Sequence, residues 1–324
     1  MTTDLNPKPP YRLGQHVAEA LADARSVVAL ETTIYTHGVP RPRNLEVALE
    51  TEERIRAAGS VPATIGILDG EPVVGLSVDE LATLITDDDV VKVSVRDLPV
   101  AVASGGSGGT TVAATALLAH RAGIEVFSTG GLGGVHIGAE SSFDESADLP
   151  ALSRIPILVV AAGVKSVLDI RASLERLETL SISVVGYRTR KFPAFYVADS
   201  GFELEHAVDG PSAAAQLVEA RNRLDLPGAI VVANPVPEDR QLDPETHDRV
   251  VAEAMAAAAD DDVSGSDATP FMLDYIQRAT GGASLEVNLA AYANNAEVGA
   301  SIAGALAARR NHIDAADGSQ GSSV

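Results

Sequence analysis

Two lysines interrupt apolar segments of this chain. The sequence contains only four lysines, at positions 8, 92, 165 and 191, and its other 20 basic residues are arginine. Lys165 follows the apolar segment "ILVVAAG" (157–163). A lysine amine that loses its proton is a nucleophile able to form a Schiff base, which an arginine guanidinium is not. The position of Lys165 therefore indicates that an amine is needed there, and the alternative is compositional bias and chance.

Two further charged residues lie in or directly after apolar segments. Glu31 ends the segment "VVALE" (27–31), where a carboxyl group could donate a proton or could form a turn. In "VKVSVR" (91–96) the two-residue period of a strand places Lys92, Ser94 and Arg96 on one face. We predict that this face meets an anionic ligand; the alternative is the solvent side of an edge strand.

Two glycine-rich segments have the composition of anion or metal sites. "SGGSGGTTVAAT" (104–115) precedes a predicted helix start, where free backbone N–H groups can bind phosphate, although the Gly-Lys-Ser/Thr ending of a Walker loop is missing. "STGGLGGVHIGAESSFDESADL" (128–149) contains His136 and then Asp144, Glu145, Ser146 and Asp148. Oxygen ligands so spaced suit Mg²⁺ or Mn²⁺, and the alternative is an acidic surface turn.

Two asparagines lie one heptad apart in a predicted helix near the C-terminus. Asn288 and Asn295 fall within residues 280–306 and therefore share a helix face. We expect them either to reach a pocket or to form hydrogen bonds with a neighbouring helix or subunit.

Along the chain, runs rich in Val and Ile alternate with segments in which apolar residues have helical spacing. The runs predict strands, and the spacing predicts helices at 43–59, 110–123 and 164–180. Residues 61–77 predict a hairpin that turns at Asp69 and Gly70. The alternation predicts an α/β fold with a mostly parallel central sheet flanked by helices. Because no change in composition divides the chain, we expect a single domain over residues 12–310 and disordered tails at 1–11 and 311–324.

Composition and charge narrow the classes of function. The 324 residues include no cysteine, which excludes disulfides, thiolate nucleophiles and cysteine-ligated metals. A net charge of −21 disfavours nucleic acid and anionic membranes as partners, so an anionic ligand is expected to be small and bound in a local basic pocket. No apolar run approaches the roughly 18 residues of a membrane span, and the first residues lack the apolar region of a signal peptide. We therefore expect a cytoplasmic protein.

Ten motifs between residues 12 and 310 resemble, in order, those of the pseudouridine-5'-phosphate glycosidase family, also called the indigoidine synthase A-like family. They are "ALETTIYTHGVPRPRN", "VPATIGILDG", "KVSVRDLP", "GGTTVAAT", "FSTGGLGGVHIGAE", "FDESADL", "AAGVKSVLD", "VVANPVPE", "TPFML" and "TGGASLEVNLAAYANNA". The resemblance implies reversible cleavage of the C–C glycosidic bond of pseudouridine 5'-phosphate to uracil and ribose 5-phosphate, in pseudouridine catabolism. It also implies a divalent cation, typically Mn²⁺ or another such as Mg²⁺, and a homotrimer.

The resemblance also implies roles for individual residues. Lys165 would be the nucleophile that bonds to ribose C1′, Glu31 the proton donor and Asp144 the metal ligand. Substrate contacts would be made by Lys92, Val112, Thr129, His136, Ser146, Ala147, Asp148 and Asn288. The chain departs from the family pattern at Val95, at Ile137 and at the pair Glu286 and Val287, where basic residues are replaced, and these departures bear on phosphate binding.

The glycosidic bond itself explains the need for an amine. Ordinary glycosidases protonate an oxygen leaving group, but here C1′ is joined to carbon C5 of uracil, which has no lone pair to protonate. If an acid such as Glu31 assists opening of the ribose ring, the amine of Lys165 can bond to C1′ and leave a Schiff base for water to hydrolyse. Two rival functions stay open: a Schiff-base aldolase or lyase acting on another sugar phosphate, and a non-catalytic nucleotide-binding protein.

Overall fold

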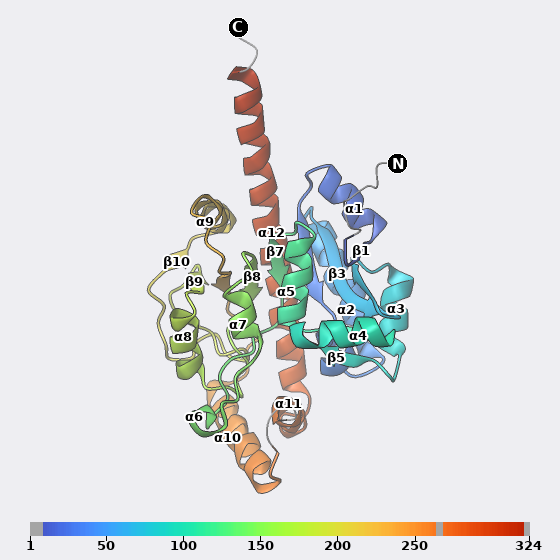
Figure 1. The fold of residues 1–324 in the computed structure, drawn as a ribbon. Helices are drawn as coiled ribbons and strands as arrows, with labels where there is room; N and C mark the ends of the chain where they lie inside the picture. Colours follow the sequence, from blue (N-terminus) through green and yellow to red (C-terminus); the bar gives the residue numbers. More distant parts are fainter. Residues whose placement is uncertain (1–8, 264–267, 321–324) are drawn as a thin grey trace.

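A mostly parallel sheet of 11 strands runs through the computed structural model, which describes residues 9–263 and 268–320, with side chains to residue 311 (Figure 1). The strand order is β1-β4-β3-β2-β7-β8-β11-β9-β10, and β6 joins β3 and β5. The strands are β1 (Arg12–Leu13), β2 (Val27–Glu31), β3 (Val61–Leu68), β4 (Glu71–Val74), β5 (Val91–Val93), β6 (Gly108–Thr110), β7 (Val126–Ser128), β8 (Leu158–Ala161), β9 (Ser183–Tyr187), β10 (Ala207–Val208) and β11 (Ile230–Ala233). Only the pairings of β3 with β4 and with β6 are antiparallel within the described residues. The predicted α/β class and its single mostly parallel sheet are confirmed.

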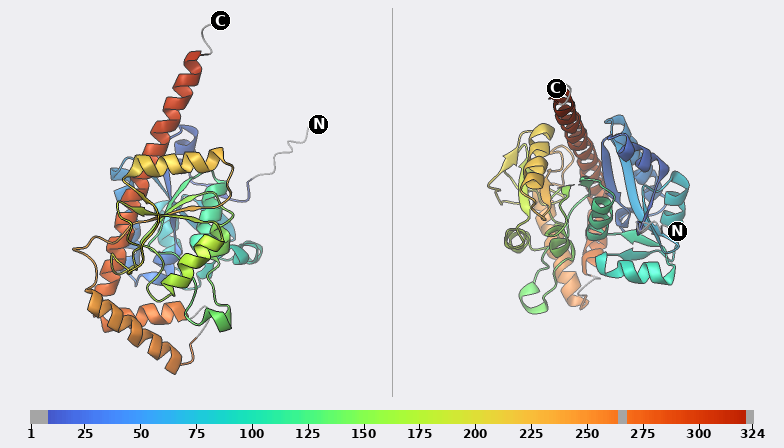
Figure 2. Two further views of the ribbon diagram at one scale, coloured as in Figure 1. Left: turned by 90° about the vertical axis from the view of Figure 1, so that its left-hand side faces the viewer. Right: turned by 45° about the horizontal axis from the view of Figure 1, so that its top comes forward.

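Side chains of the central strands alternate between two apolar layers. Val27 and Ala29 of β2 pack into one layer, whereas Val28 and Leu30 pack into the other. Because both faces are buried, the central strands are continuous apolar runs without alternating polar residues. Figures 1 and 2 show the covering helices on either side of the sheet, with α12 passing along its middle.

Different helices cover the two faces, except that α12 contributes to both, through Val287 and Ala291 on one and Leu289 and Tyr292 on the other. The layer that contains Val27 receives α1 (Gln15–Ala22), α5 (Val112–Arg121), α7 (Asp148–Leu152), α8 (Ile170–Thr179), α10 (Pro244–Asp260) and α11 (Ala268–Ala279). The layer that contains Val28 receives α2 (Arg43–Ala57), α3 (Val78–Thr86), α9 (Pro211–Arg223) and α12 (Ala283–Gln320). Shorter segments are the π-helical turn η1 (Ile34–Gly38), the 3-10 turn η2 (Val95–Asp97), α4 (Leu98–Ser104) and α6 (Ala139–Ser142).

Local sequence signals explain the elements that were predicted correctly. The hairpin between β3 and β4 turns at Asp69 (φ 47°) and Gly70 (φ 78°), two positive φ values that an Asp-Gly pair adopts readily. Helix α5 follows directly after Thr111, whose side chain accepts a hydrogen bond from the N–H of Ala114. Helix α2 ends at Ala57, just before Gly59, as its spacing predicts.

Two predicted boundaries are wrong. Helix α8 begins at Ile170 and not at Val164, because Asp169 is its N-cap and accepts a hydrogen bond from the N–H of Ala172 at 2.8 Å. Lys165 therefore lies in the loop between β8 and α8. Strand β5 ends at Val93, because a reciprocal cap between the next residue, Ser94, and Asp97 starts η2.

The early end of β5 separates the residues that a longer strand would have placed together. Ser94 and Arg96 do not share a strand face with Lys92. The side chain of Arg96 is 85% exposed and its Nε lies 3.4 Å from Asp97. Of the two cations expected on this face, only Lys92 faces a cavity within the described residues.

The chain termini differ in part from the predicted tails. Helix α12 continues to Gln320, whereas we expected disorder from residue 311; a helix that has formed extends at one hydrogen bond per added residue, and residues 311–320 contain no proline to stop it. Near the other end, the Tyr11 hydroxyl donates to the carbonyl of Arg121 at 2.6 Å. Residues 1–8 and 321–324 of the predicted tails lie outside the described residues. No helix in the described part of the chain is long and apolar enough to cross a membrane.

Candidate active site

The carboxyl ends of three neighbouring parallel strands bring the predicted catalytic residues together. Glu31 ends β2, Thr129 follows β7, and Lys165 lies in the loop after β8. Such strand ends share one edge of the sheet, where open α/β sheets bind their ligands. Glu31, Lys92, Lys165 and Asn288 line one cavity of about 570 Å³, a size typical of small-molecule sites.

The Glu31 side chain is buried, with 7% of its surface exposed. Its Oε1 accepts a hydrogen bond from the Thr129 hydroxyl. Burial raises the pKa of Glu31 to about 7, against the opposing effects of the Lys165 charge and the Thr129 hydrogen bond. A carboxyl group with this pKa is partly protonated at neutral pH, which is the state that a general acid needs.

Two amines face the same space. The pKa of Lys92 is lowered first by its partial burial and then by repulsion from the positive charge of Lys165. The Lys165 loop is fixed to the second glycine-rich segment, because the Lys165 N–H donates to the carbonyl of Leu132 at 3.1 Å. Besides Arg41 and Asp274, which is paired with Arg278, the cavity therefore holds a buried acid and two amines, a set suited to an anionic substrate with an electrophilic carbon.

The second glycine-rich segment allows close contacts that a side chain would block. A Cβ at Gly131 would lie 2.6 Å from the Phe195 ring, and one at Gly133 would lie 2.1 Å from Ser146 Oγ. Asp148 fixes this arrangement, because its Oδ2 accepts from the Gly133 N–H at 2.9 Å. The glycines at these positions are thus required by the close approach of Phe195 and of the Ser146 loop.

The start of helix α5 is occupied by protein groups. Asp148 Oδ1 accepts from the Ala113 N–H at 3.0 Å, and the Thr111 hydroxyl accepts from the Ala114 N–H. Val112 is the first residue of α5 and is buried. Val112, Ser146, Ala147 and Asp148 are not among the residues that line the cavity, so their contacts with substrate stay predictions.

Asp144 and His136 lie side by side in the loop that follows β7. Asp144 Oδ2 is 3.7 Å from His136 Nδ1, and 29% of the Asp144 side chain is exposed. Desolvation lowers the pKa of His136; Asp144 opposes this effect, whereas the charges of Lys165 and Lys92 add to it. No group of three His, Asp or Glu side chains that could bind a metal occurs in the described part of the chain. A Mg²⁺ or Mn²⁺ ion at the Asp144 carboxylate would have to be held largely by water, and this site stays a prediction.

The two asparagines of α12 have different roles. Asn288 lines the cavity, and its buried Oδ1 has no hydrogen-bond partner among the described residues. Asn295 is fully buried and donates to the carbonyls of Thr129 and Gly130 at 2.7 and 3.2 Å. Its Oδ1 accepts from Asn234 at 2.9 Å. Asn288 is thus free to bind a ligand donor, whereas Asn295 fixes α12 to the end of β7.

Several residues of the cavity carried no signal that we recognised in the sequence. They are supplied by η1 and the residues after it, by α11 and by the loop after β9: His37, Arg41, Phe195, Tyr196 and Gln277. Phe195 has φ 60°, an unusual backbone conformation for a bulky residue. The motif "ALETTIYTHGVPRPRN" contains His37 and Arg41, and "TPFML" lies four residues before Gln277, whereas no motif covers Phe195 and Tyr196.

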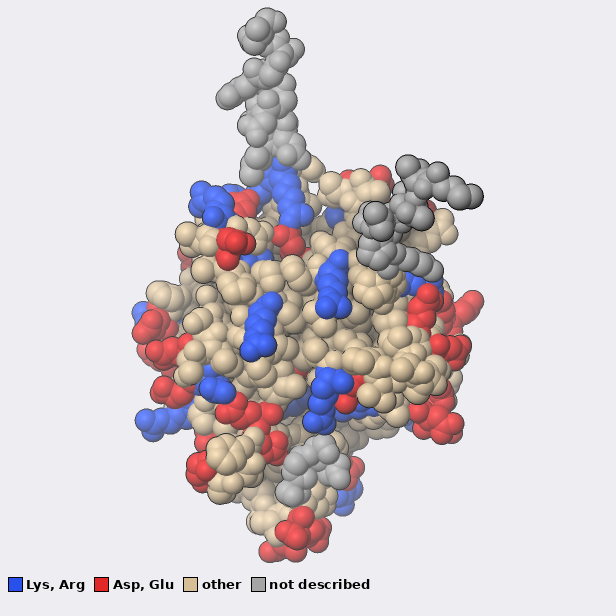
Figure 3. All heavy atoms as spheres, in the orientation of Figure 1, with Lys and Arg blue, Asp and Glu red and all other residues tan. Residues whose placement is uncertain are grey.

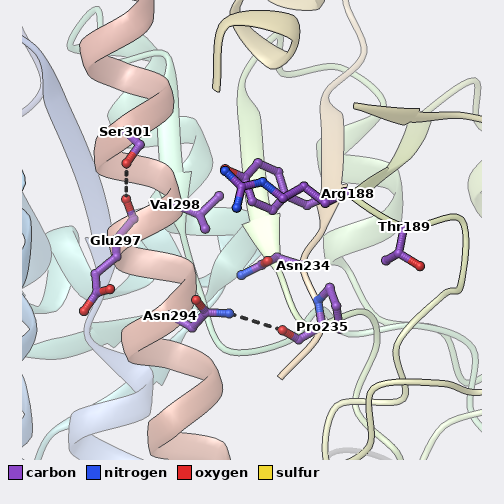
Figure 4. A pocket seen from close by; sticks show the side chains of 9 residues that line it. Arg188, Thr189, Asn234, Pro235, Asn294, Glu297, Val298 and Ser301 are labelled. Atoms are coloured by element: carbon purple, nitrogen blue, oxygen red, sulfur yellow. Dashed lines mark hydrogen bonds between the residues drawn. The ribbon is translucent and has the colours of Figure 1, made fainter. Parts of the chain in front are cut away.

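A second hollow beside α12 lacks the groups needed for this chemistry. It measures about 440 Å³ and is shown in Figure 4, where Arg188 lies over the Tyr187 ring and Asn294 donates to the carbonyl of Pro235. Its carboxylate, Glu297, is paired with Arg54 at 2.6 Å. On the face shown in Figure 3, acidic side chains gather mainly near the margin. The cavity with Glu31 and Lys165 is therefore the better candidate for catalysis.

Comparisons with known proteins place the chain among relatives of one kind. A family model described as indigoidine synthase A like protein matches residues 16–305. A pseudouridine-5'-phosphate glycosidase of Saccharopolyspora erythraea is 61% identical over 295 residues, which are 91% of this chain and 97% of the relative. One from Salinispora tropica is 56% identical over 300 residues, which are 92% of this chain and 93% of the relative.

Two solved structures have the same fold. The prealnumycin C-glycosynthase AlnA in complex with ribulose 5-phosphate is 35% identical, with a TM-score of 0.88 over 94% of this chain and 100% of that one. An indigoidine synthase A-like protein of Thermotoga maritima is 33% identical, with a TM-score of 0.84 over 94% of this chain and 100% of that one.

Proposed function

This chain is an enzyme of the indigoidine synthase A-like family, and we propose that it reversibly cleaves pseudouridine 5'-phosphate to uracil and ribose 5-phosphate. The observation that carries the proposal is the buried Glu31, with a pKa raised to about 7, in one cavity with Lys165. The names of the curated relatives support this substrate. The ribulose 5-phosphate in the complex of the C-glycosynthase supports a sugar phosphate as ligand of the fold.

The proposed reaction assigns one step to each group. Protonated Glu31 donates its proton to the ribose ring oxygen as the ring opens, and the neutral amine of Lys165 bonds to C1′. The amine passes one proton to the Glu31 carboxylate as it bonds to C1′ and the C1′–O4′ bond breaks. The electron pair of the C1′–C5 bond then leaves with uracil, which takes up this proton at C5, while the nitrogen lone pair forms the C=N bond of the Schiff base. Water then hydrolyses the Schiff base, which releases ribose 5-phosphate and restores Lys165.

Binding is assigned to residues around these two. Lys92 provides a positive charge for the 5'-phosphate, and the free Oδ1 of Asn288 accepts from a donor of the substrate, such as an N–H of uracil. A divalent cation held by Asp144 and water would add positive charge to a site for an anionic substrate. The homotrimer, the cytoplasmic location and the role in pseudouridine catabolism stay predictions from the sequence.

The proposal is tested by trapping the Schiff base. Incubation with ribose 5-phosphate and borohydride should add one pentose-phosphate mass to the peptide that contains Lys165. Lys165→Ala and Lys165→Arg should take no label and lose turnover, because neither provides a nucleophilic amine. Lys191→Ala is the matched control, since Lys191 is 61% exposed and paired with Asp199, and it should label normally.

Three outcomes would favour a rival function. A label on Lys92 with near-normal turnover of Lys165→Ala would refute the assigned roles. Labelling without exchange of uracil into ribose 5-phosphate would indicate an aldolase or lyase of another sugar phosphate. Stabilisation by the nucleotide with neither label nor turnover would indicate a binding protein.

A further inference from the structure

A third cavity lies at the opposite edge of the sheet from the candidate active site. It measures about 580 Å³ and lies between the C-terminal half of α9 and the starts of β9 and β11, at Ser183 and Ile230. Glu31 and Lys165, in contrast, lie at or beyond the carboxyl ends of parallel strands. None of the residues that line this cavity lines the candidate active site.

A buried arginine without an acidic partner lines this cavity. Arg221 on α9 is 5% exposed, and its Nη1 is buried without a hydrogen-bond partner among the described residues. Its Nε and Nη2 donate to one neutral group, Asn222 Oδ1, at 3.2 and 2.8 Å. Glu125 does not neutralise it, because that carboxylate accepts from Asn222 and pairs with Arg310.

An unpaired buried charge is costly, and this one stays charged. Burial lowers the pKa of Arg221 to about 10, which still leaves the guanidinium protonated at neutral pH. Arginine has a planar array of donors that matches carboxylate and phosphate groups. A buried guanidinium whose Nη1 is unused is therefore complementary to an anion from outside the chain.

The walls of the cavity indicate what else the ligand must carry. Leu217 lines it, and Leu224 and Leu226 lie at its surface with 68% and 52% exposure. The hydroxyl residues Ser181 and Ser183 also line it. Apolar walls with a few polar groups and one charge are the usual composition of a site for a small amphiphilic ligand.

We propose that this cavity binds a small amphiphilic anion, whose carboxylate or phosphate pairs with Arg221 and whose apolar part packs on Leu217, Leu224 and Leu226. The site is independent of the proposed reaction, since it shares no lining residue with the cavity of Lys165. Its size admits a carboxylic acid or a monophosphate with an apolar group of moderate size.

Calorimetric titration with hexanoate, hexyl phosphate and 1-hexanol tests the proposal on the full chain. Both anions should bind with one site per chain, and the alcohol at least about tenfold more weakly, because it lacks the charge that pairs with Arg221. Arg221→Met keeps the apolar stem and should weaken hexanoate binding at least about tenfold. Leu224→Glu, at an exposed position, should weaken the anions more than the alcohol, because it adds charge repulsion to the loss of an apolar contact.

Two control variants locate the bound probe. Arg223→Met removes an exposed arginine from the same helix and should leave hexanoate binding unchanged. Lys92→Ala should also leave it unchanged, which excludes binding in the candidate active site. The proposal is overturned if neither anion binds at millimolar concentration, or if Arg221→Met binds hexanoate as tightly as the wild type does. A change in subunit number on Arg221→Met in sedimentation would also overturn it, since the occupant would then be a carboxylate of another copy.

Discussion

Glu31 shows how burial raises the pKa of a carboxyl group toward neutral pH. Its side chain is buried at the end of β2, where the ionised form loses the solvation of water. The Thr129 hydroxyl and the charge of Lys165 compensate for only part of this loss. Glu31 is therefore partly protonated at neutral pH in the same cavity as Lys165. Its burial lowers the free energy of unfolding at neutral pH.

This cost predicts a pH-dependent effect of Glu31→Gln. Burial raises the pKa of Glu31 from 4.5 to about 7, so the folded state binds the proton more tightly than the unfolded state. The associated stability is present below pH 4.5 and is lost as the pH rises through about 7. Relative to wild type, Glu31→Gln should therefore gain about 2–3 kcal/mol between pH 4 and pH 8. Urea unfolding at several pH values measures this difference, and parallel curves for the two proteins would contradict the assignment.

Asp144 predicts a metal effect that can be measured without turnover. If Asp144 provides the only protein carboxylate to the ion, Asp144→Ala should weaken Mn²⁺ binding at least about tenfold by calorimetry. EDTA should abolish turnover of the wild type, and added Mn²⁺ should restore it. Glu140→Ala, an exposed carboxylate of the same loop, is the control and should bind Mn²⁺ as the wild type does. Full activity of Asp144→Ala in chelated buffer would refute the site.

At the level of helices and strands, the sequence predicted those elements whose position depends on local spacing and turn residues. The helix α2, the Asp69-Gly70 hairpin and the strands of the central sheet follow from spacing and turn chemistry that the sequence displays. The start of α8 and the end of β5 were missed, although Asp169 and the pair Ser94 and Asp97 are capping signals of the kind that set such boundaries.

The composition of the cavity was predictable only in part. Glu31, Thr129 and Lys165 follow strands that pair in the sheet, so their proximity follows from the fold class. His37, Phe195 and Gln277 reach the cavity through tertiary packing of η1, the loop after β9 and α11. No periodicity encodes those contacts, because they join segments far apart in the sequence.

The Asn295 side chain of α12 bonds to the residues just after β7, one of which, Thr129, bonds to Glu31. Asn295→Ala would remove its hydrogen bonds to Thr129, Gly130 and Asn234, and would leave buried polar groups without partners. We expect a loss of about 2–4 kcal/mol in the free energy of unfolding and lower activity, since Thr129 bonds to Glu31.

The neighbouring asparagine provides the comparison for this prediction. Asn294 is half-buried and donates only to the carbonyl of Pro235, at 3.2 Å, among the described contacts. Asn294→Ala should therefore cost at most about 1 kcal/mol. Denaturant unfolding of both variants tests the difference, and equal losses would show that Asn295 does not hold α12 to the sheet.

At the scale of the whole molecule, Glu31 and Arg221, two buried charged groups with shifted pKa values, lie far from each other's surroundings. Glu31 lies at the carboxyl edge of the sheet, in the cavity of the proposed reaction, and Arg221 lies near the opposite edge. Neither group is among the charges that shift the pKa of the other. The two residues also share no hydrogen-bond partner in the described part of the chain. Their contributions to stability should therefore be independent.

This independence gives a quantitative prediction for a double variant. Without a bound anion, Arg221→Met removes an unpaired buried cation and should raise the free energy of unfolding by about 1–3 kcal/mol. At pH 8, Glu31→Gln should add its own gain, and the double variant should equal the sum within about 0.5 kcal/mol. Urea unfolding of the wild type, the two single variants and the double variant at pH 8 measures whether the two gains add. A larger deviation would show that the two edges of the sheet are coupled, and a loss of stability in Arg221→Met would show that its charge is already compensated.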